Sequence, residues 1–127
     1  LINETRFGDK IEIFGDRDLM IRTFNNLFKN AIEATLGRRR PKIHVYIKEY
    51  DNKHVMVEIS DNGFGIPEEV VPKIFKPNFT TKTSGTGLGL AFVKQTITSI
   101  GGSITYETRL NHGTTFFILM PLYNGQK

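Results

Sequence analysis

The chain has 127 residues, of which 39% are hydrophobic and 24% are charged, and it contains no cysteine. This length fits one domain with a single core. The composition is too apolar for a disordered chain, and the sequence has no apolar run of the ~20 residues that are needed to cross a bilayer. The missing cysteines exclude disulfides, thiol catalysis and cysteine-bound zinc, and they fit a reducing compartment. A net charge of +4 suits an anionic ligand or an acidic partner, but it is too small and scattered to indicate nucleic-acid binding by itself.

The N-terminal part of the chain predicts a short strand and a long helix. Residues 10–13 alternate between polar and apolar side chains, which is typical of a strand. Either Asp16 or Asp18 caps a helix that runs to about Leu36, because apolar side chains recur at helical spacing and Gly37 supplies a stop.

A hairpin and a glycine-rich loop follow. Residues 43–47 and 55–59 alternate in the same way around a turn at residues 51–52, which predicts two paired strands. Residues 61–65 form a loop, and Pro67 fits the first turn of a short helix that continues to Ile74.

The C-terminal part predicts a mobile loop, a helix and two strands. Residues 76–87 are rich in Pro, Thr, Ser, Gly and Lys, and residues 88–100 form a helix that two glycines end. Residues 103–108 and 114–120 form strands around a turn, and the second is apolar on both faces, which predicts a central position in the sheet. The elements together predict an α+β fold, a two-layer sandwich with helices on one side of a mixed, largely antiparallel sheet.

Two asparagines on the first helix suggest a cation site. Asn26 and Asn30 lie four residues apart and share a helix face, with Thr23 and Glu33 beside them. Either asparagine alone is best explained as a solvated polar residue. The amide oxygens of the pair could ligate Mg²⁺, which bridges substrate phosphates.

The carboxylate of Asp61 follows a strand that should be buried. Such a group can accept a hydrogen bond from the exocyclic amine of adenine, whereas the carbonyl of guanine would repel it. Gly63 and Gly65 let the backbone turn sharply and approach a flat ligand. Taken alone, Asp-Asn-Gly favours an ordinary turn.

A second glycine motif, residues 85–90, opens a helix. Unpaired N–H groups and the positive dipole end make such a site suited to phosphate. The spacing is neither that of a Rossmann fingerprint nor that of a Walker loop, and the alternative is a flexible hinge. Lys82, with Thr80 and Thr81, lies close enough along the chain to reach the outer phosphates, although a solvated lysine is the fair alternative.

Taken together, these motifs resemble the ATP-binding catalytic domain of sensor histidine kinases, within the Bergerat-fold ATPase superfamily. The resemblance covers about residues 10–122, with four motifs in the family's order and a closing glycine–threonine element. In chain order they are the N box (26–34), the G1 box (61–66), the F box (74–82), the G2 box (85–90) and residues 113–116.

The resemblance implies a role for each of these residues. Asp61 would accept the adenine amino group with Thr115 assisting through water, Asn30 and Asn26 would hold Mg²⁺, and Lys82 would complete the catalytic set. Phe75 and Phe79 would anchor an ATP lid over residues 76–86. The implied ATP-binding residues are Asn26, Asn30, Asp61, Gly63, Gly65, Ile66, Phe75, Thr80, Thr81, Lys82, Gly85, Thr86, Gly87, Leu88, Gly89, Leu90 and Thr115.

Two positions depart from related patterns. ATP-hydrolysing relatives of the chaperone and topoisomerase kind place a glutamate at the position of Asn26, where it activates water. An amide cannot accept a proton, and general-base catalysis is worth about 10²–10⁴ in rate. We therefore expect bound ATP to wait for a protein nucleophile. Many family members carry a basic residue at the position of Glu33, so either Lys29 or Lys82 supplies that charge or phosphate binding is weaker.

The resemblance also implies partners outside this chain. His44, His54 and His112 lie in predicted strands or a turn, and we assign them no catalysis. We expect one domain over residues 1–127 that transfers the ATP γ-phosphoryl group to a histidine on a separate helical dimerisation domain, with a response-regulator receiver domain downstream. We expect this domain to be a cytoplasmic monomer that has no signal peptide and binds neither nucleic acid nor a membrane. The parent protein could be anchored in the plasma membrane.

Alternatives remain at this level. One is an ATP-hydrolysing Bergerat-fold enzyme, and another is a nucleotide-binding regulatory module without transfer activity. The arginines at residues 38–40 are read as a solvated loop, with a docking contact for an acidic partner as the alternative.

Overall fold

The computed structural model describes residues 2–5, 12–76 and 89–123, with the backbone alone for residues 2–5. Its elements in chain order are β1 (Ile2–Thr5), α1 (Arg17–Ala34), β2 (Ile43–Asp51), β3 (His54–Asp61), the 3₁₀ helix η1 (Val71–Lys73), α2 (Gly89–Ser99), β4 (Ser103–Arg109) and β5 (Gly113–Pro121).

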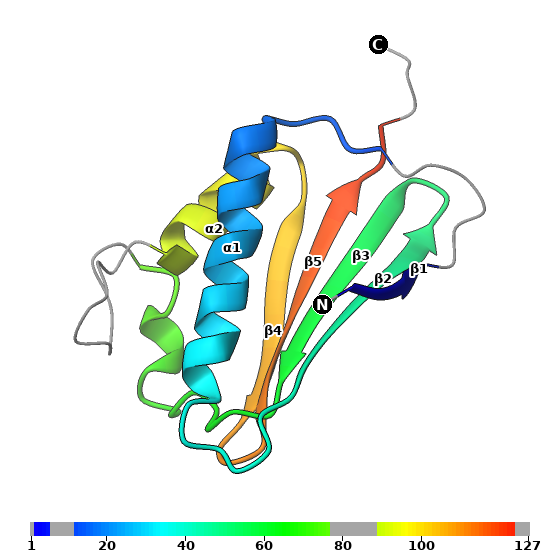
Figure 1. Cartoon of the computed structure of the whole chain (residues 1–127). Coiled ribbons are helices and arrows are strands. Elements are labelled where there is room, and N and C mark those ends of the chain that lie inside the picture. The colour runs from blue at the N-terminus through cyan, green and yellow to red at the C-terminus, as the bar shows by residue number, and fades with distance from the viewer. Residues whose placement is uncertain (1, 6–11, 77–88, 124–127) are drawn as a thin grey trace.

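The five strands form one sheet in the order β1-β2-β3-β5-β4. β1 runs parallel to β2, and the other neighbouring pairs are antiparallel. Both α-helices cover one face of this sheet (Figure 1). The mixed two-layer sandwich is therefore confirmed, and so is the central place of β5 between β3 and β4.

The short helix expected between Pro67 and Ile74 is present, but only as a 3₁₀ helix over Val71–Lys73. Two turns lead into η1, in which Pro72 occupies one of the first positions. Because proline has no N–H to donate, an α-helical ladder cannot pass through it. The described residues hold two α-helices and one 3₁₀ helix, which agrees with the expectation of about three helices.

The strand expected over residues 10–13 is not seen in its described part. Glu12 and Ile13 lie outside any strand, and the first half of that segment lies outside the described residues. The backbone N–H of Tyr123 donates to the Glu12 carbonyl oxygen over 2.7 Å, and the rings of Phe14 and Tyr123 stack with centroids 5.6 Å apart. This segment thus packs against the chain that leaves β5, and β1 takes the place beside β2.

The ends of α1 are determined by local hydrogen bonds. The Leu19 N–H donates to the Asp16 carboxylate over 3.1 Å, so Asp16 is the N-cap. Asp18 lies in the first turn, where its negative charge interacts favourably with the positive end of the helix dipole. At the other end the Thr35 hydroxyl donates to the Ile32 carbonyl oxygen over 2.9 Å.

The core lies between the two helices and the sheet. α1 contributes Leu27 and Ala31, and α2 contributes Val93 and Ile97. The sheet residues that share this core are Val45, Val55, Val57, Ile59, Ile104, Phe116, Ile118 and Met120. Among the described residues, no helix is both long enough and apolar enough to cross a membrane.

Replacing Ile118 should destabilise the domain strongly. Ile118 is 0% exposed at the centre of the sheet, and we expect Ile118→Ala to lower the free energy of unfolding by about 2–5 kcal/mol through the lost contacts and the cavity left behind. Ile21→Ala is the matched control, because Ile21 is 50% exposed on α1 and its replacement should cost under about 1 kcal/mol. Urea unfolding measures both, and equal losses would contradict this view of the core.

Candidate functional site

The end of β3 lies beside the end of α1. Asp61 is the last residue of β3 and pairs with Thr114 of β5, on the same sheet face as buried Ile59. The chain then passes under α1, where the Phe64 N–H donates to the Ala34 carbonyl oxygen over 3.2 Å. Figure 1 shows these ends meeting at the lower end of the sandwich, next to the turn between β4 and β5.

Backbone N–H groups orient the Asp61 carboxylate. Its Oδ1 accepts from the Gly63 N–H over 2.8 Å and from the Thr114 N–H over 3.3 Å. Among the described residues, no donor reaches the second oxygen, Oδ2. One oxygen is therefore fixed by the fold, and the other is available to a ligand.

Burial raises the pKa of Asp61 above its ordinary value, because the ionised form loses water. The hydrogen bonds from Gly63 and Thr114 lower the same pKa and offset part of this effect. A partly desolvated acceptor with one free oxygen is suited to a neutral N–H donor such as an exocyclic amine.

The structure does not support the water-mediated role expected for Thr115. The Thr115 hydroxyl lies 2.9 Å from that of Ser60, on the sheet face opposite to the helices. Thr114 lies beside Asp61 instead, and its hydroxyl is 2.8 Å from that of Thr108. Sequence reasoning missed Thr114, because only the pairing of β3 with β5 decides which of two adjacent threonines faces the site.

The glycines of the loop after β3 serve close packing within the protein. A Cβ at Gly63 would overlap the carbonyl oxygen of Ala34. Gly65 has a φ of +81°, and a Cβ there would strike the Arg109 carbonyl. The expected sharp turn is present, but the space that both glycines leave is filled by α1 and the β4–β5 turn and not by a ligand.

The predicted Mg²⁺ ligands lie together on α1. Asn26 and Asn30 are both half-buried, one turn apart, on a helix that packs against α2 and β3. Their amide oxygens are hard donors of the kind that Mg²⁺ accepts. In the described part of the chain, no three His, Asp or Glu side chains lie close enough to hold a metal ion.

The remaining predicted residues are only partly described. Ile66 donates its N–H to the Thr108 hydroxyl over 2.9 Å, and Phe75 packs against Tyr106 with ring centroids 5.9 Å apart. Gly89 begins α2, and a Cβ there would meet nothing within 4 Å. Leu90 packs against the core. Outside the described residues lie Phe79, Thr80, Thr81, Lys82, Gly85, Thr86, Gly87 and Leu88.

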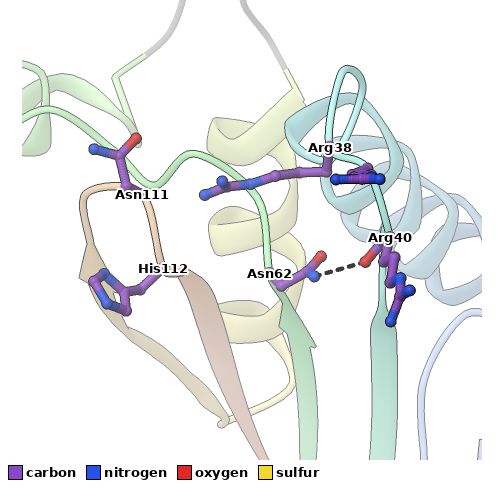
Figure 2. Close-up of a pocket in the computed structure, with 6 residues that line it drawn as sticks. Arg38, Arg40, Asn62, Asn111 and His112 are labelled. Atoms are coloured by element: carbon purple, nitrogen blue, oxygen red, sulfur yellow. Dashed lines mark hydrogen bonds between the residues drawn. The ribbon is translucent and has the colours of Figure 1, made fainter.

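A basic pocket of about 390 Å³ lies at the same end of the sandwich (Figure 2). Asn62 links its walls, donating to the Arg40 carbonyl oxygen over 2.9 Å and accepting from the Lys42 N–H over 2.8 Å. The residues that line the pocket are Arg38, Arg39, Arg40, Asn62, Asn111 and His112. The arginine loop is thus fixed at its backbone to the loop after β3.

The raised pKa of Asp61 predicts a pH dependence of stability. The folded chain holds the Asp61 proton more tightly than the unfolded chain, whose carboxyl titrates near pH ~3.9. Relative to Asp61→Asn, the wild-type protein should therefore gain stability as the pH falls from 7 through the folded pKa.

Urea unfolding between pH 7 and pH ~3 measures this difference, and the lower limit lets the pH pass below the ordinary carboxyl pKa. Asp51 provides a control of opposite sign, because the N–H of Lys53 and the His54 side chain hold its pKa below the ordinary value. The wild type should lose stability relative to Asp51→Asn as the pH falls through the pKa of Asp51. A difference between wild type and Asp61→Asn that does not change with pH would contradict the prediction.

The arrangement matches a known family. Residues 15–124 match the family model described as "Histidine kinase-, DNA gyrase B-, and HSP90-like ATPase". The catalytic domain of the histidine kinase ThkA is 39% identical with a TM-score of 0.78, over 94% of this chain and 76% of that one. The mycobacterial sensor histidine kinase MprB is 27% identical with a TM-score of 0.76, over 87% of this chain and 76% of that one.

The curated relatives are much longer than this chain. Signal transduction histidine-protein kinase AtoS of Escherichia coli is 36% identical over 87% of this chain and 18% of its own length. Sensor histidine kinase ZraS of Salmonella typhimurium is 38% identical over 91% of this chain and 24% of its own length. The matched part is about a quarter or less of either relative. The chain therefore belongs to the family of histidine kinase-, DNA gyrase B- and HSP90-like ATPases, as the ATP-binding domain of a sensor histidine kinase.

Proposed function

We propose that this domain holds Mg-ATP and transfers its γ-phosphoryl group to a histidine on a separate helical dimerisation domain. The observation that carries the proposal is the half-buried Asp61, whose Oδ1 is fixed by two backbone N–H groups while Oδ2 is left for a ligand. The half-buried amides of Asn26 and Asn30 add a second polar group on α1, in the helix layer that packs against the strand ending at Asp61.

Adenine recognition rests on Asp61 in this proposal. The adenine amino group donates to Oδ2, and the carbonyl of guanine at the same place is repelled by the carboxylate. Selectivity arises because the acceptor is partly desolvated and cannot rotate away without losing its bonds to Gly63 and Thr114. Thr114 replaces Thr115 as the threonine beside the base.

The triphosphate end depends on Asn30, Asn26 and residues outside the described part of the chain. Asn30 and Asn26 would hold Mg²⁺, which when bound neutralises charge on the phosphates. Lys82 and the amides of residues 85–90 supply further phosphate contacts in the proposal. An amide at Asn26 cannot accept a proton from water, so the bound nucleotide awaits the histidine nucleophile.

The partners follow from the same proposal. The relatives are named histidine kinases. This chain matches 18% of the length of AtoS and 33% of the length of the sensory histidine kinase/phosphatase NtrB of Rhizobium meliloti. We infer that the acceptor histidine lies elsewhere in the parent protein. A receiver domain then takes the phosphoryl group, and the domain itself works as a cytoplasmic monomer.

Asp61→Ala should weaken binding of adenine nucleotides about ten- to a hundredfold, because a buried hydrogen bond loses one partner at a cost of roughly 1–3 kcal/mol. Calorimetric titration with ADP measures the change. Asp51→Ala is the control, since it removes a carboxylate at the β2–β3 turn, at the opposite end of β3, and it should leave ADP affinity unchanged. Unchanged affinity in Asp61→Ala would contradict the adenine contact.

Asn30→Ala should reduce the contribution of Mg²⁺ to ATP binding. We expect a loss of about tenfold or more in Mg²⁺ and little change in EDTA, since the lost group contacts the metal. Labelled ATP mixed with the acceptor domain should then give no phosphohistidine. Asn25→Ala is the matched control, because Asn25 is exposed on the same helix.

Two outcomes would contradict this assignment. One is an Asn30→Ala protein that phosphorylates its partner normally. The other is fast ATP hydrolysis by the wild-type domain without any partner, which would favour the hydrolysing members of the family over a transferase.

A further inference from the structure

Arg38 reaches from the loop after α1 across the loop that follows β3. Its Nη2 donates to the Gly63 carbonyl oxygen over 2.8 Å. Its guanidinium carbon lies 4.4 Å from the centre of the Phe64 ring, at cation–π distance. Figure 2 shows the side chain extended over this loop in the direction of Asn111.

Arg38 differs from the two arginines that follow it. Arg39 and Arg40 are exposed, whereas Arg38 is partly buried and its Nε is shielded from water without a hydrogen-bond partner among the described residues. A shielded N–H without a partner is unfavourable, so the contacts with Gly63 and Phe64 must outweigh that cost. The hydrogen bond to Gly63 and the contact with Phe64 therefore distinguish Arg38 from a solvated arginine.

Gly63 joins Arg38 to Asp61. Its carbonyl oxygen accepts from Arg38, and its N–H donates to Asp61 Oδ1 over 2.8 Å. On a third side the backbone of Ala34 leaves no room for a Cβ. Any shift of Gly63 consequently moves the donor that orients the Asp61 carboxylate.

We propose that Arg38 is a positioning residue of the adenine site, which acts on Asp61 through Gly63. By holding the Gly63 carbonyl, Arg38 keeps the neighbouring N–H on Oδ1 and so directs Oδ2 to the adenine amino group. The inference rests on the proposed function in one respect, the contact between Asp61 and adenine.

Arg38 acts through geometry and not through its charge. The pKa of Asp61 is raised by burial and lowered by the N–H groups of Gly63 and Thr114, and no charged side chain of the described residues contributes. Loss of Arg38 weakens the Gly63 hydrogen bond, which is one of the two influences that keep the carboxyl ionised. The pKa of Asp61 should therefore rise further in an Arg38 variant.

A double-mutant cycle tests this inference. ADP affinity is measured by calorimetry for the wild type, Arg38→Gln, Asp61→Ala and the double variant. We expect Arg38→Gln to weaken ADP binding about three- to tenfold in the wild-type background and less than about twofold in the Asp61→Ala background, since the two residues act as one unit. Arg39→Gln, a neutralised neighbour on the same exposed loop, should bind ADP like the wild type.

The pH dependence of ADP binding provides the second measurement. The midpoint at which affinity falls on acidification should lie at higher pH in Arg38→Gln than in Arg39→Gln, and comparison between the two variants cancels the ionisation of ADP itself. A residue that only stabilised the fold would leave this midpoint unchanged.

The outcomes separate the inference from the proposed function. Equal losses in both backgrounds, or an unmoved pH midpoint, would overturn the role of Arg38 while leaving Asp61 in place. Wild-type ADP affinity in Asp61→Ala would instead remove the adenine contact and the inference with it. Should thermal unfolding show that Arg38→Gln does not fold, Arg38→Lys is used in the same cycle, because lysine keeps the charge and loses the planar fork.

Discussion

The proposed nucleotide site depends on a carboxylate that is held half-buried at the end of a core strand. Burial makes the charge of Asp61 costly, and two backbone N–H groups offset this cost at one oxygen only. The other oxygen lacks a donor among the described residues, and in the proposed function this imbalance makes the position selective. A fully solvated aspartate would bind water equally well at both oxygens and would distinguish adenine poorly.

The support for that carboxylate comes from two parts of the chain that are distant from it in sequence, namely the end of α1 with the loop that follows it, and the β4–β5 turn. The loop after β3 is bound above by the end of α1, where Phe64 donates to Ala34, and at its side by Arg38. On the other side the Asn111 N–H donates to the Phe64 carbonyl oxygen over 2.8 Å, which ties the loop to the β4–β5 turn. Because these parts of the chain continue directly from elements that pack in the core, they hold the loop in the fixed position that Asp61 needs as a hydrogen-bond acceptor.

The sequence predicted elements well where the signal was local. An aspartate cap, the helical spacing of α1 and the apolar character of β5 each arise within a few residues, and the structure has all three, with Asp16 and not Asp18 as the cap. The strand expected near Glu12 is not seen in the described residues, and the helix expected after Pro67 is shortened to a 3₁₀ helix. An alternating pattern does not determine which strand a segment pairs with. Pro72 has no N–H to donate, so the apolar spacing around it cannot produce a continuous α-helix.

For the site, the sequence by itself determined the chemical groups, namely an acid after a strand, paired amides on a helix and glycines in the turn after the acid. Only the tertiary structure decided that Thr114 and not Thr115 accompanies Asp61, and that Arg38 and not Arg39 holds Gly63. Adjacent residues of one type are equivalent in sequence. Strand register and the crossing of two loops distinguish them, because hydrogen bonds form between atoms that meet in space, whatever their separation along the chain.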